Sequence, residues 1–131
     1  MVALDTNVIV RLLTNDDPAQ VARARALLER ETVWVGMAVL LETAWVLRAV
    51  YQLDRRVVGE ALKRFSSLPQ VVVEDDTRMR RVLELYDSGL DFADALHLVA
   101  ARTHASSFAS FDASLARHAA VCGARPPVVA P

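Results

Sequence analysis

The sequence predicts a three-layer α/β/α fold around a central parallel sheet of four or five strands. Short apolar strands alternate with helices along the whole chain, and this alternation is typical of a parallel sheet that helices cover on both faces. The 131 residues are 53 % hydrophobic and 24 % charged, which excludes a disordered chain and suits one globular domain over residues 1–131. No internal repeat, low-complexity segment or linker interrupts the pattern.

The first half of the chain contains two predicted strands, each followed by helices. Val2-Ala3-Leu4 is a continuous apolar run that ends at Asp5, and the apolar residues after it recur at helical spacing. Asp17-Pro18 is typical of a helix start, because Asp caps free N–H groups and Pro fits the first turn. Thr32–Val35 is β-rich and is closed by Gly36. The predicted elements are, in order, a strand over 2–4, a helix through 8–13, a helix over 18–30, a strand over 32–35, an apolar helix over roughly 37–51 and an amphipathic helix over 55–66.

The second half repeats the alternation with shorter elements. Val71-Val72-Val73 is entirely β-branched, as expected of a buried strand. Asp76 is a helix cap, and Ser88-Gly89 is a stop signal after that helix. The predicted elements are a strand over 71–73, a helix from 76 to about 86, a helix over 91–104, a strand within 107–111, a short helix through 118 and a last edge strand within 126–131.

Charge and cysteine content exclude several protein classes. Fifteen basic and sixteen acidic residues give a formal net charge of −1, which argues against a strongly basic nucleic-acid coat protein. Cys122 is the only cysteine, so an internal disulfide and a multi-cysteine zinc site are excluded. The N-terminal residues lack the basic and apolar regions of a signal peptide, and the longest charge-free run, 32–41, is too short to span a bilayer. We therefore expect a cytoplasmic protein without a membrane partner.

Acidic residues occur at the carboxyl ends of predicted strands, where parallel sheets bind their ligands. Asp5 ends the first strand and Asp112 the fourth, while Asp91 and Asp94 lie on one face of a helix start. Glu42 is the only charge in a long apolar segment and has no helical neighbour that could pair with it. Each has an ordinary alternative: a helix cap, a favourable helix-dipole position or an exposed surface side chain.

The acidic residues predict a function only when they are considered together. Four converging carboxylates would repel one another and raise each other's pKa unless a cation joined them. Ligand sets made only of oxygen select hard ions such as Mg²⁺ or Mn²⁺, which retain water and accept phosphate oxygens. Such an ion activates water and neutralises phosphate, so the set predicts phosphodiester hydrolysis.

Four motifs in order carry a resemblance to a known family. Asp5-Thr6-Asn7, the isolated Glu42, Asp91-Phe92-Ala93-Asp94-Ala95-Leu96-His97 and Ser110-Phe111-Asp112 together resemble PIN-domain ribonucleases, and within them the VapC-type toxins of bacterial toxin–antitoxin pairs. The family often has Thr where this chain has Ser110, and the hydroxyl is retained. The resemblance implies metal ligation by Asp5, Glu42, Asp94 and Asp112, with Asp91 as an auxiliary acid and Thr6, Asn7 and Ser110 as hydrogen-bonding support.

The same resemblance implies partners. It predicts cleavage of RNA with Mg²⁺ or Mn²⁺, a homodimer, and an antitoxin protein that holds the enzyme inactive. Because the chain is not basic overall, DNA would be contacted only indirectly, through the antitoxin. Affinity for RNA must then come from local arginines, and we expect contacts from Arg11, six residues after Asp5, and from Arg48, six residues after Glu42.

Other interpretations stay open at this point. A receiver domain would need a Lys near the last strand, and the only Lys is Lys63; a haloacid-dehalogenase-like phosphatase would need Asp-x-Asp where this chain has Asp5-Thr6-Asn7. Glu74-Asp75-Asp76 is either a second metal cluster or a turn with a helix cap, and His97 either a ligand or a structural residue. In function, the alternatives are a non-catalytic binding module of the same fold and a housekeeping RNA-processing nuclease.

Overall fold

The chain has an α/β fold in which parallel strands lie between helices, as the sequence predicts. The computed structural model describes residues 1–131, which form two compact units, Met1–Asp76 and Thr77–Pro131. None of its helices combines the length and apolarity needed to cross a membrane. The elements of the first unit are β1 (Val2–Ala3), α1 (Thr6–Thr14), α2 (Pro18–Arg30), β2 (Val33–Val35), α3 (Met37–Ala49), α4 (Arg55–Ser66) and β3 (Val71–Val73).

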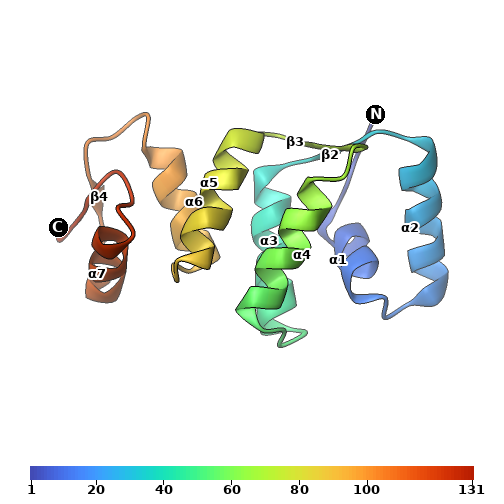
Figure 1. The fold of residues 1–131 in the computed structure, drawn as a ribbon, viewed down its shortest axis with the longest axis horizontal. Helices are drawn as coiled ribbons and strands as arrows, with labels where there is room; N and C mark the ends of the chain where they lie inside the picture. The colour runs from blue at the N-terminus through green and yellow to red at the C-terminus, as the bar shows by residue number, and fades with distance from the viewer. The chain divides into compact units, whose positions relative to one another are not determined.

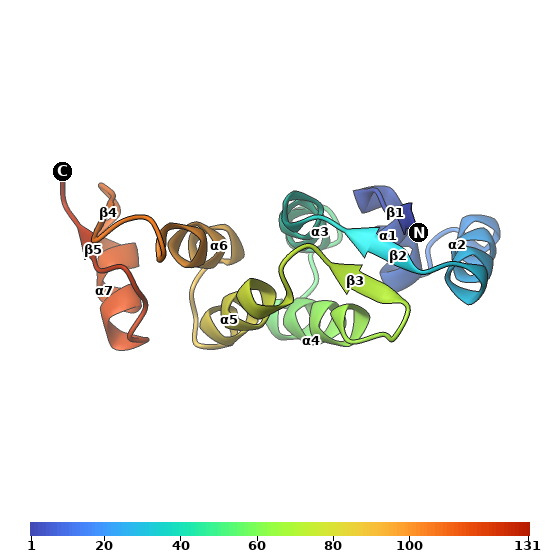
Figure 2. The ribbon, with the colours of Figure 1, turned by 90° about the horizontal axis from the view of Figure 1, so that it is seen from above.

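The first unit is built on a parallel sheet in the order β1-β2-β3. Helix α1 lies between α2 and α3 (Figure 1), and α3 and α4 lie on opposite sides of β2 and β3 (Figure 2). The first and last residues of β2 and of β3 are buried. Trp34 and Val72 are register partners on the other face and stay 37 % and 39 % exposed. Helices therefore lie on both sides of the sheet, as predicted, and the face that carries Trp34 and Val72 stays partly exposed.

Helix starts in the first unit follow the local sequence where a capping side chain is present. Asp17 accepts a hydrogen bond from the backbone N of Gln20 at 3.1 Å, and Pro18 occupies the first helical position. The predicted bounds of α2, α4 and β3 are confirmed. Helix α3 begins after Gly36, which has no side-chain cap, and the carboxylate of Glu74 accepts from the N of Met37 at 2.6 Å instead. Glu74 thus acts as a long-range cap.

The second unit is helical with one short pair of strands. Its elements are α5 (Asp76–Asp87, beginning at the boundary), α6 (Phe92–Ala101), β4 (Phe108–Ala109), α7 (Ala113–Val121) and β5 (Val128–Val129). The rings of Tyr86 and Phe92 pack edge to face at 5.7 Å between centroids. Helix α7 extends past the predicted end at His118, because further alanines favour helix until Gly123 adopts φ +64°.

Hydrogen bonds divide the five strands between two parallel sheets, β1-β2-β3 and β4-β5. The sequence predicts the parallel strands but places four or five of them in a single sheet, and the structure differs in this grouping. The strands β1, β4 and β5 have two residues each, so each offers only a few ladder hydrogen bonds to a neighbour. The edge strand predicted within 126–131 is present as β5, paired with β4.

Candidate metal centre

Asp5 lies between β1 and α1, at the carboxyl end of the strand and the amino end of the helix. Its backbone has the extended conformation of a cap residue, at φ −90° and ψ 160°, yet its side chain makes no capping hydrogen bond. The carboxylate is exposed. The capping alternative for Asp5 therefore does not hold, and its oxygens are available to a ligand.

Glu42 lies on α3 and is exposed, and its carboxylate is hydrogen-bonded to a residue of α1. The hydroxyl of Thr6 donates a hydrogen bond to Glu42 Oε2 at 2.7 Å, and Thr6 itself is buried. The bond holds the Glu42 carboxylate against the residue that follows Asp5. The first unit therefore places two of the predicted metal ligands around the amino end of α1, with the exposed Asn7 as the next residue.

The second unit brings three aspartates into electrostatic contact. Asp91 Oδ2 accepts from the N of Ala93 at 3.1 Å and from the N of Asp94 at 3.3 Å, which makes Asp91 the cap of α6. Asp112 Oδ1 accepts from the N of Leu115 at 3.0 Å and caps α7. Each cap uses one carboxylate oxygen and leaves the other for a ligand.

The pKa of Asp94 is raised by its burial and by the two neighbouring aspartates. Burial raises its pKa above the ordinary value of 3.8, and the negative charges of Asp91 and Asp112 raise it further. Among the groups that act on Asp94, only His97 acts in the opposite direction. The charged form of Asp94 is thus disfavoured until a cation arrives.

None of the predicted acidic ligands forms an ion pair with a basic side chain. Within neither unit do three or more His, Cys, Asp or Glu side chains come close enough to hold a metal ion, and this also holds for the segment Glu74-Asp75-Asp76. The donor set nevertheless fits a hard divalent cation, since it consists of carboxylate oxygens, and such a cation would relieve the repulsion that Asp91 and Asp112 exert on Asp94. Their union in one metal site stays a prediction.

The hydroxyl of Ser110 supports the Asp112 backbone. Ser110 Oγ accepts a hydrogen bond from the N of Asp112 at 3.1 Å, and the N of Ser110 donates to the carbonyl of Val129 in β5 at 3.0 Å. Asp112 is therefore fixed from both sides, by Ser110 before it and by its own cap of α7 after it.

The two predicted RNA-contacting arginines both have structural partners. The guanidinium of Arg11 donates to Asp16 at 3.2 Å, to Gln20 at 2.6 Å and to the hydroxyl of Tyr51 at 3.1 Å. Arg48 donates to the carbonyl of Leu53 at 2.8 Å. The Arg11 network joins residues up to 40 positions apart in sequence, so no local pattern could reveal it.

A cavity of about 680 Å³ lies between α1 and α2. Three of its lining residues are arginines, and Arg23 makes no hydrogen bond or ion pair with another residue. Asn7, two residues after Asp5, lines it as well. The first unit thus has a cavity lined by three arginines and by Asn7, a residue close in sequence to a predicted metal ligand. Its polar lining residues are Asn7, Arg11, Gln20, Arg23 and Arg30.

Replacement of Thr6 by Val tests the bond to Glu42. Val matches Thr in shape and removes the donor, so we expect a stability loss of about 1 kcal/mol. In the metal-dependent cleavage that the sequence predicts, we expect a fall of roughly 10–100-fold, as for other residues that orient metal ligands. Urea unfolding and cleavage rates measure the two effects. Thr6→Ser keeps the hydroxyl and should recover the activity; a Thr6→Val protein as active as the parent would contradict an orienting role for this bond.

Comparison with known proteins gives one family. The family model described as PIN domain matches residues 2–121, so the match includes Asp5, Glu42, Asp94 and Asp112. None of the curated proteins matches the chain.

Proposed function

The chain belongs to the PIN-domain family, and from this premise we propose that it is a Mg²⁺- or Mn²⁺-dependent endoribonuclease that hydrolyses RNA phosphodiester bonds. PIN domains are generally metal-dependent nucleases, and PIN nucleases act on RNA. The observation that carries the proposal for this chain is that Asp91 and Asp112 lie close enough to Asp94 to act on its charge, while none of the three forms an ion pair with a basic side chain. Like charges without a basic partner disfavour their own charged forms, a cation would relieve this repulsion, and groups perturbed in this way are candidates for a functional site.

The proposed metal ligands are Asp5, Glu42, Asp94 and Asp112, with Asp91 as an auxiliary acid. When bound, a divalent ion supplies a nucleophilic water and neutralises phosphate charge. The protein's own residues fix the ligands beforehand: Thr6 holds Glu42 through its hydroxyl, and Ser110 holds the backbone of Asp112. Such preorganisation reduces the free energy needed to bring like charges together around the ion.

The cavity between α1 and α2 supports an anionic substrate. Guanidinium groups bind phosphate with two parallel hydrogen bonds, and Arg23 is available for this purpose, whereas Arg11 is already bonded to Asp16. Asn7, which also lines the cavity, lies two residues after Asp5 in the sequence. We propose that the RNA backbone follows this cavity and that Arg11 and Arg48 contribute positive charge to its surroundings.

The finer proposal is that the protein is the toxin of a VapBC-type toxin–antitoxin pair. It rests on the order and spacing of the four motifs, from Asp5-Thr6-Asn7 to Ser110-Phe111-Asp112. It includes a homodimer, a cognate antitoxin protein that keeps the nuclease inactive, and contact with DNA only through that antitoxin.

Cleavage of RNA by the purified protein tests the nuclease proposal. Single-stranded RNA should be cut in Mg²⁺ or Mn²⁺, and cutting should stop when a chelator removes the ion and resume when the ion is restored. RNA that stays intact in either metal, with a folded protein, would favour the alternative of a non-catalytic binding module.

Expression in a bacterial host tests the toxin proposal separately. We expect growth arrest that is relieved by coexpression of a small protein encoded beside this one, and no arrest with Asp94→Asn. Unaffected growth in cells that contain abundant, active nuclease would instead support a housekeeping RNA-processing enzyme.

A further inference from the structure

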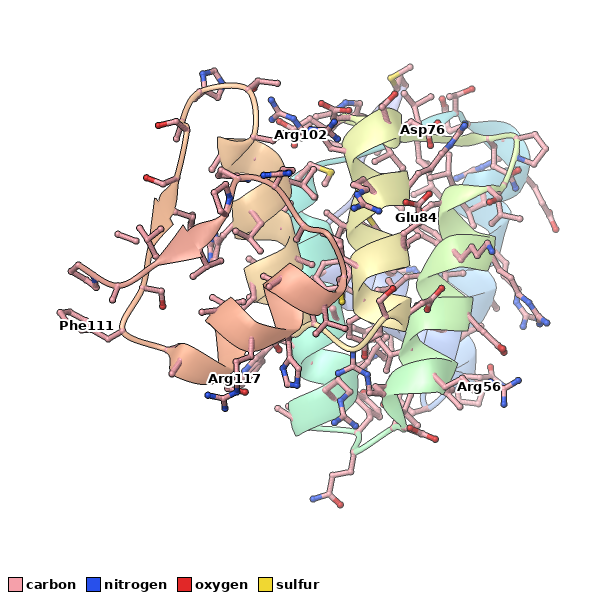
Figure 3. The ribbon with its side chains drawn as sticks, turned by 60° about the vertical axis from the view of Figure 1, so that its left-hand side comes forward. Arg56, Asp76, Glu84, Arg102, Phe111 and Arg117 are labelled. Carbon is pink, nitrogen blue, oxygen red and sulfur yellow. The ribbon has the colours of Figure 1, made fainter.

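Phe111 is the most exposed large hydrophobic side chain of the protein, with 91 % of its surface accessible. It lies in the loop between β4 and α7, and Figure 3 shows its ring projecting away from the ribbon. A phenyl ring in water lacks the favourable free energy that burial would give. The side chain therefore contributes little to the stability of the fold, and its ring is accessible to a ligand.

The loop holds Phe111 in place through the residues on both sides of it. The N of Ser110 is bonded to Val129 in β5, the N of Asp112 to Ser110 Oγ, and the Asp112 carboxylate to the N of Leu115 in α7. A backbone fixed on both sides loses little conformational freedom when its side chain binds something. Aromatic side chains on fixed backbone make efficient contact groups for this reason.

The charges around Phe111 indicate which part of a nucleic acid it can contact. Asp112 is the next residue, and Asp112 and Asp91 both act on Asp94, so a phosphate without a cation would be repelled here. A nucleobase is flat and uncharged, and every base offers a π-face to an aromatic ring.

The residues next to Phe111 in the sequence differ from those of a protein-docking patch. Its neighbours along the chain are small or polar: Ala109, Ser110, Asp112, Ala113 and Ser114. A protein interface requires a wider apolar area than a single ring. Aromatic side chains stack on the unpaired bases of single-stranded RNA, and one accessible ring is enough for one base.

We propose that Phe111 is a nucleobase-binding site, at which the ring stacks on an unpaired base of single-stranded RNA next to Asp112. This inference rests on the proposed ribonuclease function, and it adds a residue that positions the substrate by its base instead of its phosphate. It implies that the enzyme prefers single-stranded to fully paired RNA, because a paired base is not available for stacking.

The test measures binding of a labelled single-stranded RNA by fluorescence anisotropy, in an Asp94→Asn background so that the RNA is not cut. Loss of one stacked base predicts that Phe111→Ala binds roughly 5–100-fold more weakly. Phe111→Trp should bind like the parent, whereas Phe111→Leu, which is apolar but not aromatic, should stay weak. Val121→Ala is the matched control, since Val121 is also exposed, at 86 %, and lies at the far end of α7.

A second RNA, identical in backbone but with abasic positions, separates stacking from a general effect on the loop. The parent should bind it as weakly as Phe111→Ala binds intact RNA, and Phe111→Ala should cause no further loss. Stacking is overturned if Phe111→Leu binds like the parent, or if Phe111→Ala weakens intact and abasic RNA equally. If the parent protein cuts RNA but Phe111→Ala leaves RNA binding unchanged, only the stacking inference is overturned. If the parent protein binds RNA through Phe111 but never cuts it, only the nuclease proposal is overturned.

Discussion

Replacing Asp94 by Asn should abolish metal-dependent RNA cleavage while leaving the protein folded. Asn keeps the shape of the side chain but removes the negative charge, so one anionic ligand of the proposed metal is lost. Changes that only reorient a ligand already cost roughly 10–100-fold, and loss of the ligand itself should cost at least as much. Cleavage rates over a range of Mn²⁺ concentrations measure the effect, because a weakened site is partly recovered at high metal.

The matched control is Asp87→Asn, which makes the same chemical change at an exposed aspartate of α5 in the same unit. Asp87 is not among the proposed ligands, and its variant should cut RNA at the parent's rate. Circular dichroism of both variants verifies the fold. Equal cleavage by the Asp94→Asn protein and the parent would show that the metal ligands are assigned wrongly.

The sequence predicted local structure well where a single residue controls it. Asp17-Pro18 determines the start of α2, and the β-branched run Val71–Val73 forms β3 with the predicted bounds. The sequence could not predict interactions between distant residues. Glu74 caps α3 across 37 positions because Gly36 has no side chain for that role. The division of the strands into two sheets likewise depends on backbone pairing between separate segments.

The candidate site shows the same division between local and distant information. Strand ends and helix starts directed attention to Asp5, Asp91, Asp94 and Asp112, and local geometry accounts for the helix caps made by Asp91 and Asp112. Composition could not show that Asp5 leaves its helix uncapped or that Thr6 bonds to Glu42, 36 residues away. The net charge of −1 likewise could not show that the proposed metal ligands form no ion pairs with basic side chains. It also could not show that three arginines line one cavity.

Metal ions should stabilise the parent protein strongly and the Asp94→Asn variant much less. Asp91 and Asp112 repel the charged form of Asp94 without metal, and an ion that binds only the folded state adds about 2.7 kcal/mol at a concentration one hundred times its Kd. For a chain of this size that corresponds to a rise in Tm of roughly 10 °C. Thermal unfolding with Mn²⁺, and with Ca²⁺ as a second hard cation, measures the shift; an equal rise in the parent and in Asp94→Asn would place the ion elsewhere.

Without metal, we expect Asp94→Asn to be more stable than the parent protein. The pKa of Asp94 predicts how this difference in stability changes with pH. The pKa of Asp94 is raised in the folded state above 3.8, so folding favours the protonated form. The stability that this group contributes is present below pH 3.8 and is lost as the pH rises through the folded-state pKa. At neutral pH the charged Asp94 therefore destabilises the metal-free protein, and Asp94→Asn should have the higher Tm in chelator.

The difference in Tm between the variant and the parent should narrow as the pH falls toward 3.8, because the parent then carries a protonated Asp94 that resembles Asn. A metal-free variant less stable than the parent at neutral pH would mean that the Asp94 charge has a stabilising partner instead of repelling neighbours.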